Sequence, residues 1–530
     1  MRLFLYDKKQ YSEYFQYLYL QVITTFVYSD VADSQKSNRV AGNQLIRLII
    51  YEYQLTLYRM YFKQIFEPKL AQYAYLIGCQ KSKEAIIIDP MRDVDQYFTL
   101  AKRENLKLVA AADTHIHADY VSGLQEMAER GVHVYASDEG DSDWKYNWLK
   151  DSDYVHTLLH NNDVITIGNI RLKAVHTPGH TPEHLSYELV DGAATDKPMG
   201  LLSGDFVFVG DVGRPDLLET AAGQAGAMKP SAQRLFQSLQ FFKDLPDYMK
   251  VWPAHGAGSA CGKALGAVPD STVGYEKVVS TAIKLADSEE EFINFILDGQ
   301  PEPPLYFARM KKVNRDGINV LGELPAPKAM QPEELIDRDD ITVLDTRSID
   351  EFMHLHLKNS LLSTWNKAFN TVAGSYIKPE EQIVLIIHSA HIEEAVRDLV
   401  RIGLDNVIGF VDVQAFTEWI HQAEKDHTSS IPTVKFSEFN PNNPENGKVL
   451  DVRKRSEWDE TGHFKNARHI AHTRLLDRYE ELDLNTRYYV HCEASGRASV
   501  ATALLAKKGY NVVLIHDDIK QIDPSLLTKD

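Results

Sequence analysis

The stretch from Asp113 to Asp119 reads Asp-Thr-His-Ile-His-Ala-Asp, and it directly follows the apolar run from Leu106 to Ala112. Such a run predicts a buried strand, so the polar stretch lies at the end of that strand. Two imidazoles and a carboxylate this close together would be poorly hydrated there, and the imidazoles would repel one another, unless a cation were bound. We therefore predict a metal site at this strand end.

Three more apolar runs end in a histidine or an aspartate. His180 follows a Thr-Pro-Gly turn, Asp205 follows Ser-Gly, and His255 follows Pro-Ala. A further run, from Ala85 to Ile88, stops at Asp-Pro in the manner of a buried strand. Strands of layered α/β proteins hold the residues at their ends rigidly, and functional sites gather there. The pattern predicts an α/β domain that brings these side chains together.

Composition limits the classes of function. With 530 residues, 44% of them apolar, the chain can bury several cores, and we expect three folded domains. The formal charge of -18 argues against a nucleic-acid partner, which requires a basic surface. No run approaches the ~20 apolar residues of a membrane helix, so we expect no membrane partner. The chain has three cysteines, too few for a disulfide framework, which predicts a cytoplasmic protein with free thiols: Cys79, Cys261 and Cys492.

The chain divides into segments of different amino-acid composition. Residues 1–59 are rich in Tyr, Leu and Gln, and we interpret them as a poorly ordered extension or as an over-long gene model that starts upstream of Met60. Proline and glycine indicate linkers at 301–304, 317–328 and 440–447. We accordingly expect three folded domains, over residues 60–322, 328–425 and 430–530.

The last two of these domains repeat one another. Leu-Asp-Thr-Arg at 344–347, followed by Glu-Phe at 351–352, recurs as Leu-Asp-Val-Arg at 450–453, followed by Glu-Trp at 457–458. A repeat at a domain-sized period indicates two homologous domains in tandem, because the unit of a solenoid is far shorter. We therefore expect one fold to occur twice.

Cys492 ends the apolar run that begins at Tyr488, and it precedes Glu-Ala-Ser-Gly-Arg497 and an alanine-rich helix at 498–507. Loop N–H groups and the helix dipole would stabilise a thiolate there, and Arg497 would add positive charge. The arginine stands five places after the cysteine, one fewer than in protein tyrosine phosphatases, so the loop suits a terminal sulfur better than a phosphate. The first copy has no cysteine at the corresponding residues 387–394, and we interpret it as an inactive spacer or docking domain.

These motifs carry a family resemblance. Residues 60–317 resemble the metallo-β-lactamase superfamily, and the Gly-Asp-Val-Gly-Arg-Pro-Asp stretch at 210–216 resembles its persulfide dioxygenase branch. The resemblance implies an α/β fold, an αββα sandwich, with one Fe(II) per chain and zinc as the less favoured metal. The implied iron ligands are His115, His180 and Asp205. The implied residues that orient ligands or bound water are His117, Asp119 and His255.

One position departs from the superfamily pattern. Dinuclear hydrolases follow the motif aspartate with a histidine for the second metal, and here that residue is Tyr120, a poor ligand. The departure counts against a two-metal hydrolase, whereas two histidines and one carboxylate are the ligand set of non-haem iron oxygenases. Arg214 either faces an anionic substrate or anchors its loop. Cys261, in a glycine-rich loop, either packs inertly or handles sulfur, and Cys79 is predicted to be buried and structural.

Residues 430–530 resemble a catalytic rhodanese domain and residues 328–425 an inactive one, both with parallel sheets. The whole array resembles bacterial persulfide dioxygenase–sulfurtransferase fusions. That resemblance implies oxidation of a low-molecular-weight persulfide by O2 to sulfite, and then transfer of sulfane sulfur from Cys492 to sulfite to give thiosulfate, a form of sulfide detoxification. A glyoxalase II-like thioester hydrolase and a non-enzymatic sulfur carrier or sensor are the alternatives. The sequence leaves open which thiol carries the persulfide and whether the chain forms a homo-oligomer.

Overall fold

The computed structural model describes residues 60–220, 226–263, 265–300, 302–438, 440–442 and 447–529. The predictions for residues 1–59 lie outside these ranges, as does part of the predicted linker at 440–447. By their contacts, the residues from Met60 onward make one compact unit. Every helix in the described ranges is too short or too polar to cross a bilayer.

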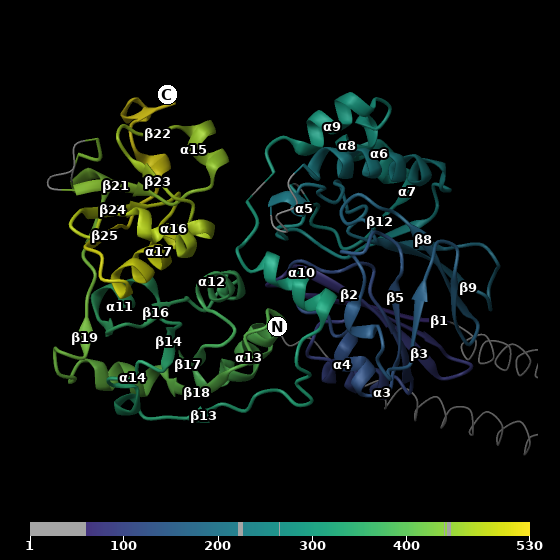
Figure 1. The fold of residues 1–530 in the computed structure, drawn as a ribbon, viewed down its shortest axis with the longest axis horizontal. Helices are drawn as coiled ribbons and strands as arrows, with labels where there is room; N and C mark the ends of the chain where they lie inside the picture. Colours follow the sequence, from purple (N-terminus) through teal and green to yellow (C-terminus); the bar gives the residue numbers. More distant parts are fainter. Residues whose placement is uncertain are drawn as a thin grey trace, which may run out of the picture. The chain divides into compact units, whose positions relative to one another are not determined.

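Two six-stranded sheets build the first part of this unit (Figure 1). The first sheet follows sequence order, antiparallel from β1 to β3 and parallel from β3 to β6: β1 (Met60–Glu67), β2 (Gln72–Cys79), β3 (Glu84–Ile88), β4 (Lys107–Ala112), β5 (His133–Ser137) and β6 (His156–Leu159). The second sheet is antiparallel except for the parallel pair β10 and β11: β7 (Val164–Ile167), β8 (Ile170–His176), β9 (Leu185–Asp191), β10 (Gly200–Gly204), β11 (Lys250–Pro253) and β12 (Ser271–Thr272).

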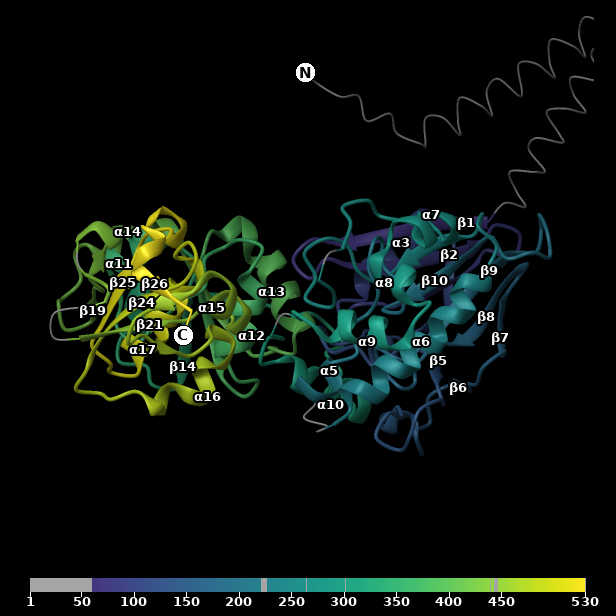
Figure 2. The ribbon, with the colours of Figure 1, turned by 90° about the horizontal axis from the view of Figure 1, so that it is seen from above.

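Side chains alternate between the two faces of each sheet and produce a layered sandwich. On β3, Ile88 packs with Leu172 of β8 in a core between the sheets, whereas the preceding Ile87 packs outward with Tyr97 of α3. On the other sheet, Val251 of β11 packs outward with α6 and α9, which lie side by side in Figure 2. The helices of this part are α3 (Asp95–Arg103), α4 (Leu124–Glu129), α5 (Leu217–Thr220), α6 (Met228–Asp244), α7 (Val273–Val279), α8 (Thr281–Leu285), α9 (Glu289–Leu297) and α10 (Phe307–Asp316). The predicted α/β sandwich is confirmed.

The remaining sequence contains a first copy of a parallel five-stranded sheet, in the order β13-β18-β17-β14-β16. Figure 1 shows β14, β17 and β18 next to one another. The strands are β13 (Lys328–Ala329), β14 (Ile341–Asp345), β16 (Leu361–Leu362), β17 (Gln382–Ile387) and β18 (Val407–Asp412), with β15 (His356–Leu357) and β19 (Thr428–Ser429) paired separately. The helices are α11 (Ile349–His354), α12 (Phe369–Tyr376), α13 (Ile392–Arg401) and α14 (Val413–Ile420).

A second copy repeats this arrangement position by position, in the order β20-β25-β24-β21-β23. Its strands are β20 (Thr433–Val434), β21 (Gly447–Asp451), β23 (Arg468–His469), β24 (Arg487–His491) and β25 (Val512–Ile515), with the pair β22 (His463–Phe464) and β26 (Leu527–Thr528). Its helices are α15 (Arg455–Thr461), α16 (Leu475–Arg478) and α17 (Gly496–Lys507). Both copies contain the same ion pair, Arg347 to Asp345 at 2.7 Å and Arg453 to Asp451 at 2.6 Å. The repeat in the sequence is therefore one fold used twice.

Helix α13 of the first copy contacts the first domain. Its last residue, Arg401, is buried, and its Nε and Nη2 donate to the two carboxylate oxygens of Asp93 at 2.9 and 2.8 Å. The Arg401 carbonyl accepts the backbone N–H of Val121 at 2.6 Å. Because Val121 lies two residues after Asp119, the contact with α13 holds the end of the histidine-rich loop.

Lys69 of the first domain contacts the first copy near the residues that correspond to the cysteine loop. Its Nζ lies 2.5 Å from Asp398 of α13 and 3.5 Å from the ring centre of Trp365. Trp365 corresponds to His472 of the second copy. The backbone N–H of Trp365 donates to the carbonyl of Thr346, and that of His472 donates to the carbonyl of Val452. Both acceptors directly follow the aspartate that ends a strand of their sheet. The cysteine-free copy therefore contacts the first domain through this position, as a docking domain would.

Candidate metal centre and sulfur-transfer site

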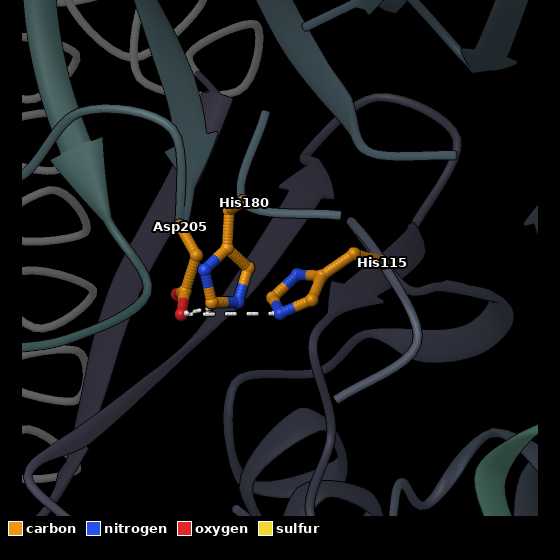
Figure 3. A group of neighbouring side chains, drawn as sticks. All are labelled: His115, His180 and Asp205. Atoms are coloured by element: carbon orange, nitrogen blue, oxygen red, sulfur yellow. Dashed lines mark ion pairs between the residues drawn. The ribbon is translucent and has the colours of Figure 1, made fainter. Parts of the chain in front are cut away.

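His115, His180 and Asp205 converge from three loops, each just after the end of a strand (Figure 3). His115 follows β4, His180 follows β8 and Asp205 follows β10, and all three side chains are buried. Asp205 Oδ2 lies 3.3 Å from His180 Nε2 and 3.9 Å from His115 Nε2. One ligand atom from each residue lies within 4.8 Å of the others, a spacing at which one ion could contact all three.

Hydrogen bonds turn the Nε2 atom of each imidazole toward this point. The Thr114 hydroxyl donates to Asp89 at 3.0 Å, so it accepts the Nδ1–H of His115 at 2.9 Å. The carbonyl of Arg214 accepts the Nδ1–H of His180 at 3.1 Å. Both Nε2 lone pairs are therefore free to bind a metal, and burial lowers the pKa of each imidazole, that of His180 to about 4.

Asp205 supplies the negative charge of the group. Its backbone N–H donates to His184 Nε2 at 3.0 Å, and His184 Nδ1 in turn bonds the Thr177 hydroxyl at 2.8 Å. Neither carboxylate oxygen of Asp205 has a hydrogen-bond partner among the described residues, although the side chain is fully buried. Burial raises the pKa of this carboxyl to about 6. A buried carboxylate without a partner beside two available imidazoles fits a divalent cation.

His117 bonds within its own part of the site. Its Nε2 lies 3.3 Å from Asp89 and 3.0 Å from the Tyr120 hydroxyl, so this nitrogen braces the loop, and its predicted role in orienting ligands or bound water stays a prediction. Burial alone would lower the pKa of His117, but the hydrogen bond and charge of Asp89 outweigh it and raise the pKa to about 9.

Asp119, His255 and Cys261 form a second buried group beside the first. His255 Nε2 lies 3.4 Å from Asp119 Oδ2 and 3.5 Å from Asp205 Oδ1, while its Nδ1 lies 3.3 Å from the Ala71 carbonyl. His255 thus contacts the candidate ligand Asp205 directly. The predicted role of Asp119 and His255 in orienting ligands or bound water stays a prediction.

Arg214 makes the contacts of a loop anchor. Its Nε and Nη2 donate to Asp216 at 2.8 and 2.5 Å, and its Nη1 donates to the Ala260 carbonyl at 3.0 Å. The side chain is 1% exposed. Of the two interpretations left open by the sequence, these contacts match the second, and they tie the 210–216 loop to the loop that carries Cys261.

A narrow cavity of about 20 Å3 lies beside His180. Its walls are mostly apolar, and its lining residues are Ile116, Ala118, Trp144, His180, Thr181, Leu217, Leu218, Phe307 and Lys311. The Lys311 ammonium is held by Asp143 at 2.7 Å and lies 4.0 Å from the Trp144 ring centre. Apolar walls thus adjoin the candidate metal centre at His180.

Cys492 lies at the end of β24, just before helix α17. Its thiol is 2% exposed and accepts the backbone N–H of Ala498 at 3.3 Å, so an N–H at the helix start faces the sulfur. Ser495 adopts φ +67°, which turns the loop tightly around the sulfur. Arg497 donates through both terminal nitrogens to Glu457, with Nη2 to Oε1 at 2.6 Å. The arginine is therefore fixed by α15 and is not free to follow a substrate.

Two parts of the chain match models of known protein families. Residues 68–293 match the model of the metallo-β-lactamase superfamily, and residues 439–523 match that of the rhodanese-like domain. A solved metallo-β-lactamase from Staphylococcus aureus subsp. aureus COL is 39% identical, with a TM-score of 0.59 over 67% of this chain and 98% of that chain. The chain belongs to the metallo-β-lactamase superfamily.

Within the superfamily, the chain is similar to proteins of two activities. The mitochondrial persulfide dioxygenase ETHE1 of Bos taurus is 29% identical over 36% of this chain and 67% of its own length. A hydroxyacylglutathione hydrolase of Actinobacillus pleuropneumoniae is 27% identical over 34% of this chain and 65% of its own length. The chain thus spans about two thirds of these relatives. A C-terminal rhodanese-like domain accompanies the metallo-β-lactamase domain, which confirms the predicted fusion architecture.

Tyr120 stands where hydrolases of the superfamily are expected to carry a second-metal histidine. Its hydroxyl is engaged by His117 Nε2 at 3.0 Å and by the Gln72 side-chain amide at 3.1 Å. The ring is fully buried, and burial raises the pKa of the phenol well above its usual range. Tyr120 therefore braces the histidine loop of the superfamily motif.

Several buried residues that support the superfamily site were missed in the sequence. His184 bonds the backbone of Asp205, Glu183 accepts the Ile116 N–H at 2.7 Å, and Asn314 of α10 donates to the carbonyls of His117 and Tyr120 at 2.7 and 2.8 Å. The positions of these residues in the sequence, relative to the motifs, gave little indication of their roles. His184 alone could have been noticed, four residues after His180.

Two further residues lie beside the Cys492 loop. Burial and then the charge of Arg497 lower the pKa of both Lys454 and His472, that of His472 to about 4. Lys454 follows the repeated Leu-Asp-Val-Arg, and its N–H donates to Glu457 at 3.0 Å. The first copy has Ser348 at the position of Lys454 and Trp365 at that of His472. A comparison of the two copies would have revealed both residues.

Proposed function

We propose that the chain oxidises a low-molecular-weight persulfide to sulfite at one iron ion and converts the sulfite to thiosulfate at Cys492, in the cytoplasm. The observation that most supports this is the buried donor set of two imidazole Nε2 atoms and a carboxylate without hydrogen-bond partners. Two histidines and one carboxylate with open positions form the ligand set of non-haem iron oxygenases. The similarity to a persulfide dioxygenase supports the same assignment.

His115, His180 and Asp205 would hold the ferrous ion, which when bound supplies coordination positions for dioxygen and for a substrate sulfur. The Thr114 hydroxyl and the Arg214 carbonyl keep both imidazoles in the tautomer with a free Nε2. The apolar walls beside His180 limit the access of water to the reacting sulfur. Overall, R–S–SH, O2 and H2O give R–SH, SO3²⁻ and two protons, so the outer sulfur is oxidised and dioxygen is reduced.

The second reaction takes place at Cys492. Its thiolate attacks the outer sulfur of another R–S–SH, the S–S bond of that persulfide breaks, and the proton passes to the leaving sulfur, which releases R–SH and leaves the persulfide anion Cys492–S–S⁻. Sulfite then attacks the terminal sulfur, the S–S bond breaks, and thiosulfate leaves with the Cys492 thiolate restored. The Ala498 N–H and the positive charge of Arg497 stabilise this thiolate. Lys454 and His472 extend the polar surroundings at which an anionic acceptor could bind.

Thioester hydrolysis is the second candidate, because a hydroxyacylglutathione hydrolase is among the relatives. That reaction would require a metal-activated water. Under this alternative, zinc-loaded protein would hydrolyse a glutathione thioester and would consume no oxygen. A sulfur carrier or sensor would do neither.

One experiment separates these three functions. The protein is purified without oxygen, its iron and zinc are measured per chain, and oxygen uptake is followed with glutathione persulfide and with coenzyme A persulfide. We expect about one iron per chain, in line with a single His-His-Asp site, and persulfide-dependent uptake. Zinc at the His-His-Asp site with thioesterase activity and no oxygen uptake would support the hydrolase. No turnover of either substrate would support the carrier.

A further inference from the structure

The cavity beside His180 is small and mostly apolar. The histidine loop, α5 and α10 form its walls and contribute Ile116, Leu217 and Phe307, side chains that are between 1% and 4% exposed. Its volume is about 20 Å3. A single water molecule needs roughly 10–15 Å3 on the same measure. The cavity therefore has room for one very small molecule and none for the thiol carrier of a persulfide.

The polar groups of the lining residues are engaged elsewhere or sealed off. Lys311 Nζ pairs with Asp143 at 2.7 Å and lies 4.0 Å from the ring centre of Trp144. Trp144 Nε1 and Thr181 Oγ1 are buried so deeply that they expose almost no surface, and a molecule in the cavity does not reach them. His180 donates from Nδ1 to a backbone carbonyl and turns Nε2 toward the metal centre. A molecule in the cavity is therefore surrounded by carbon.

These surroundings select against polar occupants. A buried water needs roughly two to four polar partners, and an apolar cavity without them stays dry and takes up apolar molecules such as xenon. The outer sulfur of an ionised persulfide is also a poor occupant, because a charge that leaves water without a partner is costly. Dioxygen is neutral, diatomic and non-polar, and it dissolves better in apolar media than in water.

We propose that this cavity is a binding site for dioxygen. The inference rests on the proposed function, in which dioxygen is a substrate of the group formed by His115, His180 and Asp205. His180 belongs to that group and also lines the cavity, so a dioxygen molecule bound there lies directly beside the metal centre. Holding a reactant next to its partner replaces an encounter from solution. The cavity would accordingly set the affinity for dioxygen and leave the affinity for persulfide unchanged.

Hydrogen bonds around the cavity keep its walls apart. The Ile116 N–H donates to Glu183 at 2.7 Å, and Asn314 of α10 donates to the His117 carbonyl at 2.7 Å. Both bonds are buried, and they tie the histidine loop to the neighbouring loop and to α10. Protein interiors are close-packed and keep few voids as large as a water molecule. A void beside a candidate ligand whose walls are fixed in this way suits a permanent binding site.

Dioxygen is its own probe, because it is paramagnetic and speeds the relaxation of nearby nuclei with a steep dependence on distance. The full chain is loaded with zinc, so that dioxygen is not consumed, and its isoleucine and leucine methyl groups are labelled for NMR. Relaxation is compared under dioxygen and under nitrogen. We expect the strongest enhancement at Ile116, Leu217 and Leu218. Ile165 and Leu201, which are equally buried in other cores, are the controls.

Variants that change the volume of the cavity connect binding to turnover. Leu217→Phe fills the cavity and is expected to lose the enhancement at Ile116. In iron-loaded protein, the same variant is expected to raise the KM for dioxygen several-fold while the KM for persulfide and the iron content stay unchanged. Leu217→Met conserves the volume and is expected to match the wild type. Should Leu217→Phe fail to fold, Phe307→Leu enlarges the cavity and is expected to strengthen the enhancement.

Three results would overturn the proposal. They are an enhancement at Ile116 no greater than at Ile165, an enhancement at Ile116 that survives Leu217→Phe, and a wild-type KM for dioxygen in that variant. Absence of oxygen uptake by the iron-loaded wild type would instead refute the proposed function. The NMR comparison on zinc-loaded protein would still decide whether dioxygen binds in the cavity, so the two failures are distinguishable.

Discussion

Cys492 is the residue whose replacement separates the two proposed reactions. We expect Cys492→Ser to consume oxygen with persulfide at the wild-type rate, because residue 492 does not contact His115, His180 or Asp205. The product is expected to change from thiosulfate to sulfite, because no thiol remains in the loop to carry sulfur. An oxygen electrode and chromatography of the two anions measure this, with a protein-free blank for the spontaneous reaction of sulfite with persulfide. Thiosulfate at the wild-type rate would show that Cys492 is not the sulfur carrier.

Lys454 is a second residue whose role can be isolated, because the chain contains its own control. Lys454→Met is expected to lower kcat/KM for sulfite about tenfold, which corresponds to the ~1.4 kcal/mol of one hydrogen bond to a charged group. Oxygen uptake is expected to stay the same. Ser348→Ala alters the corresponding position of the cysteine-free copy and is expected to change neither rate. Equal effects of the two variants on sulfite kinetics would contradict this role for Lys454.

His472 gives the stability of the rhodanese-like domain a pH dependence whose sign can be stated. Burial and the charge of Arg497 lower the pKa of His472 to about 4. An unfolded histidine titrates near ~6.5, so between these values the unfolded chain binds a proton that the folded chain does not. Stability therefore falls as the pH falls through this window, by about 1 kcal/mol between pH ~7.5 and ~5.5.

Urea unfolding of wild type and His472→Gln at both pH values measures this contribution. The variant is expected to lose about 1 kcal/mol less than the wild type on acidification, since glutamine does not titrate. An equal loss of stability in both proteins would mean that the pKa of His472 in the folded state is the ordinary one, ~6.5.

At the scale of single residues, the sequence predicted those side chains whose signal is local. His115, His117 and Asp119 stand in one short stretch, and His180 and Asp205 each follow a recognisable turn at a strand end. His184 and Lys454 were missed because their partners, Asp205 and Arg497, come from other strands and helices. Contacts between distant segments leave no periodicity or spacing in a single sequence.

Among the elements, helix α13 is expected to act beyond its own domain. Arg401→Met is expected to cost about 1–3 kcal/mol, because the buried Asp93 carboxylate loses its two-point partner and keeps, among the described residues, only Arg397 at 3.2 Å and Gln96 at 2.7 Å. The loss also loosens the backbone bond to Val121, so we expect weaker retention of metal. Thermal unfolding and elemental analysis after dialysis against a chelator measure the two effects.

Arg397 provides the control on the same helix. It pairs with Asp95, whose side chain is 47% exposed, and makes a single longer contact with Asp93 at 3.2 Å, so Arg397→Met is expected to cost less than Arg401→Met and to keep the metal. Replacing both partners, Asp93→Asn with Arg401→Met, is expected to recover part of the loss because the charge of Asp93 is removed together with its partner. If Arg401→Met and Arg397→Met retain metal equally, α13 does not support the histidine loop.

Sequence patterns predicted the elements of both repeats well, for the same reason in each case. The Leu-Asp-x-Arg motif ends a parallel strand and makes the same Asp–Arg pair in both copies. Its repetition in the sequence therefore predicted that the fold is repeated. The docking of α13 was beyond such reasoning. Its acidic and basic residues have the pattern of a solvated helix face, and only the structure shows that Arg401 and Asp398 are buried against the first domain.

For the molecule as a whole, the tether between the two sites is the property to test. Covalent linkage raises the concentration of sulfite near Cys492 if the two reactions occur in one chain. We expect an equimolar mixture of His115→Ala and Cys492→Ser to release more sulfite and less thiosulfate than the same number of wild-type active sites. The difference in thiosulfate yield between the mixture and the wild type is expected to shrink as the total protein concentration rises. A mixture that matches the wild type at every concentration would show that sulfite diffuses freely between chains.

The hydrogen bond from Val121 to Arg401 matters to anyone who divides this gene for expression in pieces. The sequence suggests a cut between residues 322 and 328, where a linker separates two folds. A fragment that ends there would lose the acceptor of the Val121 N–H and the buried partner of Asp93. A cut near residue 430 keeps both. Failure of the shorter fragment to bind metal would then reflect the position of the cut and not the chemistry of the site.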